Sequence, residues 1–311
     1  LVYADRTTTV SRSYASEIRM PFYGEGLDGL LRARSKQLSG IVNGIDYNVY
    51  NPKTDKDIAV NYSVEDVIKA KAANKTALQK ELGLEENPDA FMLGIVSRLT
   101  DQKGLDLVEC VLDQICAEDV QLVVLGTGEG KYQDMFTYYS RKYPERVSAN
   151  IFYSEALSHR IYASCDAFLM PSLFEPCGLS QLMSLRYGTL PIVRETGGLR
   201  DTVTPYNEVD GTGTGFSFTN YNAHEMLAII RYAKKTYFND RRAWNEMVLR
   251  AMKQDFSWDA SAREYEKLYD GLIEEEARRK EAIRLQQARE AAEAALKEAE
   301  KALELAKRAE E

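Results

Sequence analysis

"FMLGIVSRLTDQKGLDLVECVLDQI", residues 91–115, joins an apolar run to a segment with helical spacing through a polar loop. The run at 91–97 is apolar on both of its faces, as expected for a strand buried on both sides of a sheet. In the segment at 103–115, apolar residues return at the intervals of a helix. The order strand, loop, helix predicts one βα unit of a parallel sheet.

The same order recurs along the chain. We interpret further apolar runs as strands, at 120–126, 147–153, 166–171 and 190–193. Helical segments separate them, so we predict an α/β fold: a Rossmann-like parallel sheet with helices on both faces. The carboxyl ends of parallel strands meet at one edge of the sheet, where ligands bind. The loops expected at that edge are 97–104, 126–130, 153–160, 172–178 and 194–201.

Composition excludes several classes of protein. The 311 residues carry a net charge of −8, which argues against a nucleic-acid-binding protein. No apolar run reaches the roughly 18 residues of a membrane span, and no signal peptide opens the chain. We therefore expect a cytoplasmic protein of one large or two medium domains without a membrane partner.

The metal-binding residue types are few. The four cysteines (Cys110, Cys116, Cys165 and Cys177) show no C-x-x-C spacing. With only His159 and His224 they form no plausible zinc set. We expect reduced thiols and no metal cofactor.

The C-terminal stretch differs from the rest. Residues 274–311 contain no Gly, Pro or aromatic residue, and Ile283 is their one β-branched residue. Strong helix formers predict a continuous helix of about 57 Å, which looks like a designed extension. Because 256–273 also has a helical pattern, 256–311 should form one unbroken helix. Apolar residues, almost all of them Ala, repeat at 3–4 spacing within 285–309: Leu285, Ala288, Ala292, Ala295, Ala299, Ala302, Ala306 and Ala309. This seam suits a partner helix, although a free, solvated rod is the alternative.

The first predicted loop carries two cations, Arg98 and Lys103, at the start of a helix. Two cations beside the positive end of a helix dipole suit a diphosphate, although most such side chains are solvated surface charges. The glycines of 126–130 form either a phosphate cradle or a tight turn. The acidic D-x-D pattern at 54–57 occurs at metal-bound sugar nucleotides, but here we interpret it as a turn or cap.

Several long motifs occur in an order that resembles the bacterial glycogen synthase and plant starch synthase family. They are "SRLTDQKGLDL" (97–107), "SHRIY" (158–162), "PSLFEPCGLSQL" (171–182), "YGTLPIVRETGGLRDTV" (187–203) and "DFSW" (255–258). The family consists of retaining glucosyltransferases whose two Rossmann-like domains face each other across a cleft. The resemblance implies transfer of glucose from ADP-glucose to the non-reducing end of an α-1,4-glucan.

The resemblance also implies a domain organisation. Residues 1–40 correspond to a remnant of the family's first domain with its linker, and 41–255 to the ADP-glucose-binding domain. Residues 256–273 correspond to the native C-terminal helix, and 274–311 are the extension.

By the same resemblance, Arg98 and Lys103 grip the diphosphate of ADP-glucose and stabilise the leaving ADP, so that no metal is needed. Tyr153 lies against the adenine. His159 is a neighbour of the nucleotide, although a histidine in a helix more often simply packs. Glu175 faces the glucose, where a carboxylate accepts hydrogen bonds from hydroxyl groups and favours an oxocarbenium-like transition state.

Backbone N–H groups complete the implied site. Those of Cys177, Gly178 and Leu179 open the helix after Glu175 and meet sugar or phosphate oxygens. The Cys177 side chain itself fills a tight wall, because no base lies nearby in the sequence to activate it. "TGGL" contributes Thr196, Gly197 and Gly198, which either approach phosphate or form a structural turn. Related transferases use a second glutamate, eight residues after the first, for the ribose; here that position is Met183.

The family's first domain carries a K-x-G-G-L-type motif and a histidine-containing acceptor site, and no such stretch occurs here. Three hypotheses follow. The chain is an active glucosyltransferase, a module that binds ADP or ADP-glucose without turnover, or an engineered fusion of a rigid domain to a designed helix. The second and third are compatible, and we favour them together. Catalysis would then require the acceptor domain.

Overall fold

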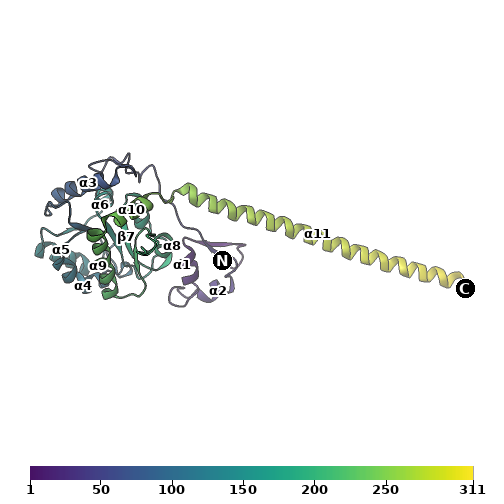
Figure 1. Cartoon of the computed structure of the whole chain (residues 1–311). Coiled ribbons are helices and arrows are strands. Elements are labelled where there is room, and N and C mark those ends of the chain that lie inside the picture. The colour runs from purple at the N-terminus through teal and green to yellow at the C-terminus, as the bar shows by residue number, and fades with distance from the viewer. Residues whose placement is uncertain (311) are drawn as a thin grey trace. The chain divides into compact units, whose positions relative to one another are not determined.

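The computed structural model describes residues 1–310. The chain forms two compact units, Leu1–Ser261 and Ala262–Glu311. The first unit contains the α/β sheet, and the second consists of most of the last helix (Figure 1).

A six-stranded parallel sheet forms the centre of the first unit, as predicted. Its order is β5-β4-β3-β6-β7-β8. The strands are β3 (Phe91–Val96), β4 (Val120–Leu125), β5 (Val147–Asn150), β6 (Ala167–Met170), β7 (Leu190–Arg194) and β8 (Phe216–Phe218). The sequence did not predict β8. β5 is shorter than the predicted run because its neighbour β4 ends at Leu125, opposite Asn150.

Helices cover both faces of this sheet, as predicted. They are α3 (Val67–Leu82), α4 (Leu105–Ala117), α5 (Gly130–Lys142), α6 (Glu155–Ser164), α7 (Ser180–Arg186), α8 (Gly197–Thr202), α9 (Ala223–Asn239) and α10 (Arg241–Met252). A short 3-10 helix, η1 (Asp101–Lys103), precedes α4. α4 packs beside α9, and α3 beside α6 (Figure 1). Right-handed crossovers put α4 and α5 on one face and α6, α7 and α8 on the other.

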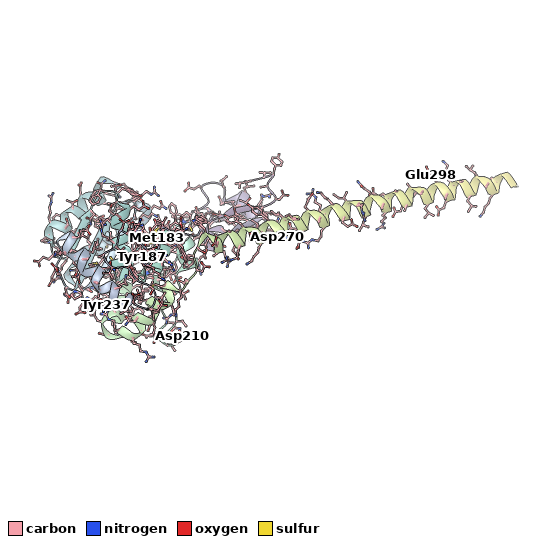
Figure 2. The ribbon with its side chains drawn as sticks, turned by 90° about the horizontal axis from the view of Figure 1, so that it is seen from above. Met183, Tyr187, Asp210, Tyr237, Asp270 and Glu298 are labelled. Carbon is pink, nitrogen blue, oxygen red and sulfur yellow. The ribbon has the colours of Figure 1, made fainter. Side chains whose placement is uncertain are left out.

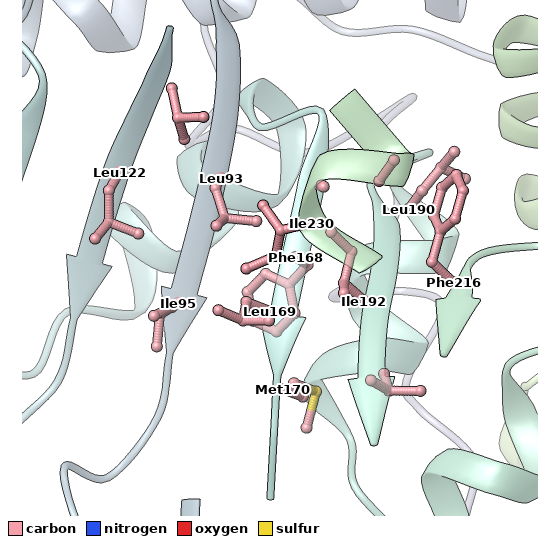
Figure 3. Packing of buried hydrophobic residues seen from close by; sticks show 14 of the residues in the cluster. Leu93, Ile95, Leu122, Phe168, Leu169, Met170, Leu190, Ile192, Phe216 and Ile230 are labelled. Carbon is pink, nitrogen blue, oxygen red and sulfur yellow. The ribbon is translucent and has the colours of Figure 1, made fainter. Parts of the chain in front are cut away.

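Apolar side chains are buried on both faces of the sheet. On one face, Leu93, Ile95 and Leu169 of neighbouring strands meet Ile230 of α9 (Figure 3). On the other face, residues such as Met92 pack with side chains of α3 and α6. Strand residues alternate between the two faces because successive side chains point to opposite sides of the sheet. The doubly apolar run at 91–96 is thereby explained.

An N-terminal segment packs onto the sheet domain. It contains β1 (Thr7–Thr9) and β2 (Leu38–Gly40), which pair in parallel, with α1 (Arg12–Glu17) and α2 (Asp28–Ala33) between them. α1 lies against α8. The Asp201 carboxylate of α8 accepts hydrogen bonds from the hydroxyls of Ser11 and Ser13, both at 2.6 Å.

The last helix, α11, runs from Trp258 to Glu310. It begins two residues later than predicted because the Ser257 hydroxyl accepts the Ala260 N–H at 3.3 Å, as an N-cap does. Residue 311 lies outside the described part of the chain. Side chains such as Asp270 and Glu298 project from the helix along its length (Figure 2). Within residues 1–310, no helix combines the length and the apolar character that crossing a membrane requires.

Candidate functional site

The five predicted loops follow the carboxyl ends of neighbouring parallel strands, so they lie along one edge of the sheet. A pocket of about 300 Å³ opens at this edge. Its lining comes from the ends of β3, β4 and β5, from α6 and α7, and from the loop before α3: Tyr50, Val96, Ser97, Arg98, Leu125, Gly126, Thr127, Phe152, Tyr153, Ser154, Glu155, Ser158, Tyr162, Ser180 and Met183.

The first loop brings its two cations to different parts of the site. Arg98 is exposed in the pocket wall, and its Nη2 donates to Gln102 Oε1 at 3.2 Å. Lys103 Nζ forms an ion pair with Glu175 Oε2 at 2.6 Å. Gly104, with φ +70°, allows the backbones of the two loops to approach closely, because a Cβ there would lie 2.0 Å from the Pro171 carbonyl oxygen. The loop after β3 therefore lies directly on the loop after β6.

Glu175 is buried and held at both its carboxylate and its backbone. Besides Lys103, the Ser172 hydroxyl donates to Oε2 at 3.0 Å. The carbonyl oxygen of Glu175 accepts the N–H of Gly198 at 3.0 Å. Buried Arg194 donates from Nε to the Ser172 carbonyl oxygen at 2.9 Å, which fixes the start of the same loop. Ser172 and Arg194 cannot be recognised from the sequence, since a loop serine and a strand-end arginine carry no distinctive pattern.

The residues after Glu175 form a close turn. Cys177 is buried, and burial raises the pKa of its thiol, so the thiol is a poor nucleophile. Gly178 has φ +68°, and Leu179 is exposed. Gln181 Nε2 donates to the carbonyl oxygens of Cys177 and Gly178 at 3.0 Å each. The turn is thus held by a side chain of the helix that it leads into.

The "TGGL" segment lies beside this turn, and its polar groups already have partners. The N–H of Gly197 donates to Glu17 Oε1 at 2.8 Å, and the Thr196 hydroxyl donates to the same oxygen at 3.1 Å. Gly198 donates to Glu175, as described above. A carboxylate of α1 therefore occupies the start of α8, where the sequence suggested phosphate or a structural turn. Glu17 lies 180 residues from Gly197, so no local pattern could reveal it.

Two of the predicted nucleotide neighbours occupy different positions. Tyr153 lies in the pocket wall and is 85% exposed. His159 is buried, and its Nδ1 lies 2.6 Å from Asp55 Oδ2. Its ring stacks on Tyr50, with the ring centroids 4.9 Å apart, and Tyr50 lines the pocket. His159 thus contacts the pocket wall only indirectly, through Tyr50. Tyr50 was not among the residues predicted from the sequence.

Asp55 anchors this stack. Its carboxylate accepts hydrogen bonds from the Tyr187 hydroxyl and, at 2.9 Å, from the N–H of Asp57, in addition to its contact with His159. Burial raises the pKa of Asp55, but the hydrogen bonds of these three neighbours outweigh burial and hold the pKa below its usual value. The bond from Asp57 makes the D-x-D pattern a turn, which agrees with the interpretation from the sequence.

Among the described residues, one group could hold a metal ion: ligand atoms of Asp55, Asp57 and His159 lie within 4.8 Å of one another. The Asp55 oxygens already accept hydrogen bonds from protein donors, so a cation would have to displace them. This geometry favours a structural role for the group.

Met183 of α7 is half-buried in the pocket lining. In the part of the chain that the structure describes, Glu155 supplies the one carboxylate of that lining. The pocket therefore has an apolar thioether at the position where related transferases carry their second glutamate.

Comparison with known proteins identifies the family. The family model for glycosyl transferases group 1 matches residues 75–248, and the starch synthase catalytic domain matches residues 1–33. The glycogen synthases of Lachnospira eligens and Lachnoclostridium phytofermentans are 70% and 64% identical to the chain over 272 residues. Each alignment covers 88% of this chain and 57% of the relative, so the chain spans little more than half the length of these relatives.

Comparison with solved structures supports the same family. The catalytic domain of starch synthase IV from Arabidopsis thaliana, bound to ADP and acarbose, matches with a TM-score of 0.81 and 36% identity. The match covers 86% of this chain and 56% of that one. Anabaena Alr3699/HepE, in complex with UDP and glucose, matches with a TM-score of 0.59 and 19% identity over 86% of this chain and 64% of that one, which shows the fold alone. The chain belongs to the group 1 glycosyltransferases, in the family of the glycogen and starch synthases.

Proposed function

We propose that residues 41–255 form the ADP-glucose-binding domain of a glycogen or starch synthase-type glucosyltransferase. The observation that carries this proposal is that one loop, at the edge of the sheet, places Arg98 in the pocket wall and pairs Lys103 with Glu175. The likeness to a starch synthase solved with ADP supports the choice of nucleotide.

The side chains divide the work by their charge. The forked guanidinium of Arg98 and the ammonium of Lys103 would bind the diphosphate and stabilise the negative charge of the departing ADP. Glu175, released from Lys103, would accept hydrogen bonds from glucose hydroxyls and favour the positive charge at the anomeric carbon. These two cations would serve in place of a metal ion. Tyr153 and Tyr50 would enclose the base.

We further propose that transfer of glucose to the α-1,4-glucan requires an acceptor domain beyond these 311 residues. The sequence lacks the family's K-x-G-G-L-type motif and its histidine-containing acceptor site.

All four cysteines are free thiols, which supports a reducing compartment such as the cytoplasm.

Calorimetric titration with ADP in the presence of EDTA tests the binding function. ADP should bind without a divalent ion. Arg98→Ala and Lys103→Ala should each weaken binding by about 1.5–3 kcal/mol, the contribution of a hydrogen bond to a charged group. Arg141→Ala, which removes an exposed cation from the last turn of α5, should leave binding unchanged. No binding of ADP, or binding that EDTA abolishes, would refute the proposal.

A second candidate function concerns α11. This helix continues without a break through 53 residues, and Leu285, Leu296 and Leu303 are each more than half exposed. These features favour an engineered rigid fusion whose helical extension packs against a partner helix along the 285–309 seam. The two proposals are compatible, because they concern different units of the chain.

A further inference from the structure

We propose that Glu17 is a positioning residue for Glu175: it holds the start of α8, and α8 holds the backbone of the Glu175 loop (residues 172–178). The inference deepens the proposed function and rests on it, because it concerns the group that would meet the glucose.

The start of α8 is capped by a residue of α1 and not by its own N-cap side chain. Thr196 is the N-cap residue of α8, but its side chain makes no capping hydrogen bond to its own helix. Its hydroxyl instead donates to both Glu17 oxygens, at 3.1 and 3.2 Å. Glu17 Oε1 also accepts the N–H of Gly197 at 2.8 Å. A carboxylate at this place satisfies N-terminal donors of the helix and interacts favourably with its dipole.

α8 contacts the Glu175 loop through the backbones of both segments. Gly198 donates its N–H to the Glu175 carbonyl oxygen at 3.0 Å. A Cβ on Gly197 would lie 1.9 Å from that oxygen, and a Cβ on Gly198 would lie 1.9 Å from the Cys177 carbonyl oxygen. Since no side chain fits between them, a shift at the start of α8 must move the loop.

The position of the Glu175 carboxylate depends on this loop. Glu175 Oε2 is held at 2.6 Å from Lys103 and 3.0 Å from the Ser172 hydroxyl, so its position depends on where the loop lies. Without the Glu17 carboxylate, the hydroxyl of Thr196, a residue only 1% exposed, would lose the acceptor it has here. An unsatisfied buried donor is unfavourable, so the start of α8 should rearrange.

The α1–α8 contact offers a matched control. Asp201, at the other end of α8, accepts hydrogen bonds from Ser11 and Ser13 and so joins the same two helices. It makes none of the contacts at the start of α8. Glu17→Ala and Asp201→Ala therefore each remove one carboxylate from the α1–α8 contact, but only the first removes the cap.

The experiment compares, in the full chain, hydrogen exchange at the Gly198 amide, which donates to the Glu175 loop, and the affinities for ADP and ADP-glucose. Glu17→Ala should speed exchange at the Gly198 amide. It should weaken ADP-glucose binding about tenfold, equivalent to about 1.4 kcal/mol, while changing ADP binding less than about twofold. Glu17→Gln, which keeps one acceptor oxygen, should restore most of the loss. Asp201→Ala should behave as the parent does.

The inference would be overturned if Glu17→Ala and Asp201→Ala had equal effects. It would also be overturned if Glu17→Ala bound both ADP and ADP-glucose as the parent does. In either case Glu17 would be only an anchor of α1. A parent chain that binds no ADP would instead refute the proposed function. In that case the exchange comparison still decides whether Glu17 holds the loop.

Discussion

At the scale of single residues, the Lys103–Glu175 ion pair defines the resting state of the site. Its two side chains are only 16% and 8% exposed, and their charged atoms lie 2.6 Å apart. In the proposed function, Lys103 therefore already has a counter-charge before the diphosphate binds. A phosphate must compete with Glu175 for the same ammonium group, and partial burial makes this competition stronger than at an open surface.

Glu175→Gln should therefore strengthen the binding of ADP, by about three- to tenfold, because Lys103 loses its competing carboxylate. The amide keeps an oxygen that can accept the Ser172 hydroxyl, so the loop should stay in place. Calorimetry at low and high salt measures the effect, which should shrink as salt screens the charges. Weaker ADP binding in Glu175→Gln would show that the carboxylate does not compete.

Asp55 should make stability depend on pH. Its pKa is held below the unfolded value of about 3.9 by its hydrogen bonds, so its contribution is present above that pH and lost as the pH falls through the folded pKa. Asp55→Asn should lower the free energy of unfolding by about 1–3 kcal/mol at neutral pH. Urea unfolding should show this difference shrinking below about pH 4.

Exposed Asp134→Asn on α5 serves as the control for Asp55 and should leave the unfolding curve unchanged at each pH. A difference between Asp55→Asn and the parent that stays constant down to acidic pH would contradict the assigned role of the carboxylate.

At the scale of elements, α11 carries apolar side chains without burying them in the described chain. Leu285 and Leu296 are 59% and 61% exposed, and the seam alanines from Ala288 to Ala306 are exposed beside them. The side chain of Ala309, the last member of the predicted seam, lies outside the described residues. Ion pairs such as Arg289–Glu293 stabilise the helix by only roughly 0.2–0.5 kcal/mol each. They form within one helix and do not indicate whether a partner helix is present.

Replacing Ala292 and Ala299 together with Glu should disrupt association through the seam and leave the α/β unit folded. Gln287→Glu with Ala294→Glu adds the same charge on the opposite side of the helix and should not disrupt it. Sedimentation gives the mass in solution, and hydrogen exchange gives the protection of the helix. If the seam variant and the parent agree in both, the helix is a free solvated rod.

At the scale of the whole molecule, the proposed function separates binding of the nucleotide sugar from access to the acceptor. The alignments with glycogen synthases span 57% of those relatives. In a two-domain transferase, the cleft between the domains excludes water and brings the acceptor to the sugar. We therefore expect the chain to bind the nucleotide without transferring glucose.

A polypeptide of these 311 residues should show no measurable transfer of labelled glucose from ADP-glucose to glycogen, because we propose that the acceptor site lies outside it. ADP binding by the same preparation confirms that the protein is competent. Robust incorporation that Glu175→Ala abolishes would contradict this expectation and make the chain a complete transferase.

The sequence by itself determined the parallel sheet, because each βα unit is encoded by neighbours such as those in 91–115. It also determined that the predicted loops share one edge, since parallel strands end together. Arg98 and Lys103 could be placed there from spacing alone, because a strand-to-helix turn fixes where its own residues lie. Periodicity missed β8, a strand of only three residues, which is too short to show a pattern.

Only the tertiary structure decided which groups meet. Lys103 and Glu175 are 72 residues apart, Asp55 and His159 are 104 apart, and Glu17 and Gly197 are 180 apart. Such pairs depend on how helices and loops pack, and a glutamate such as Glu17 looks the same in sequence whether it is solvated or caps a distant helix. The physical reason is that backbone patterns are set by near neighbours, whereas the partner of a side chain is set by the packing of the whole unit.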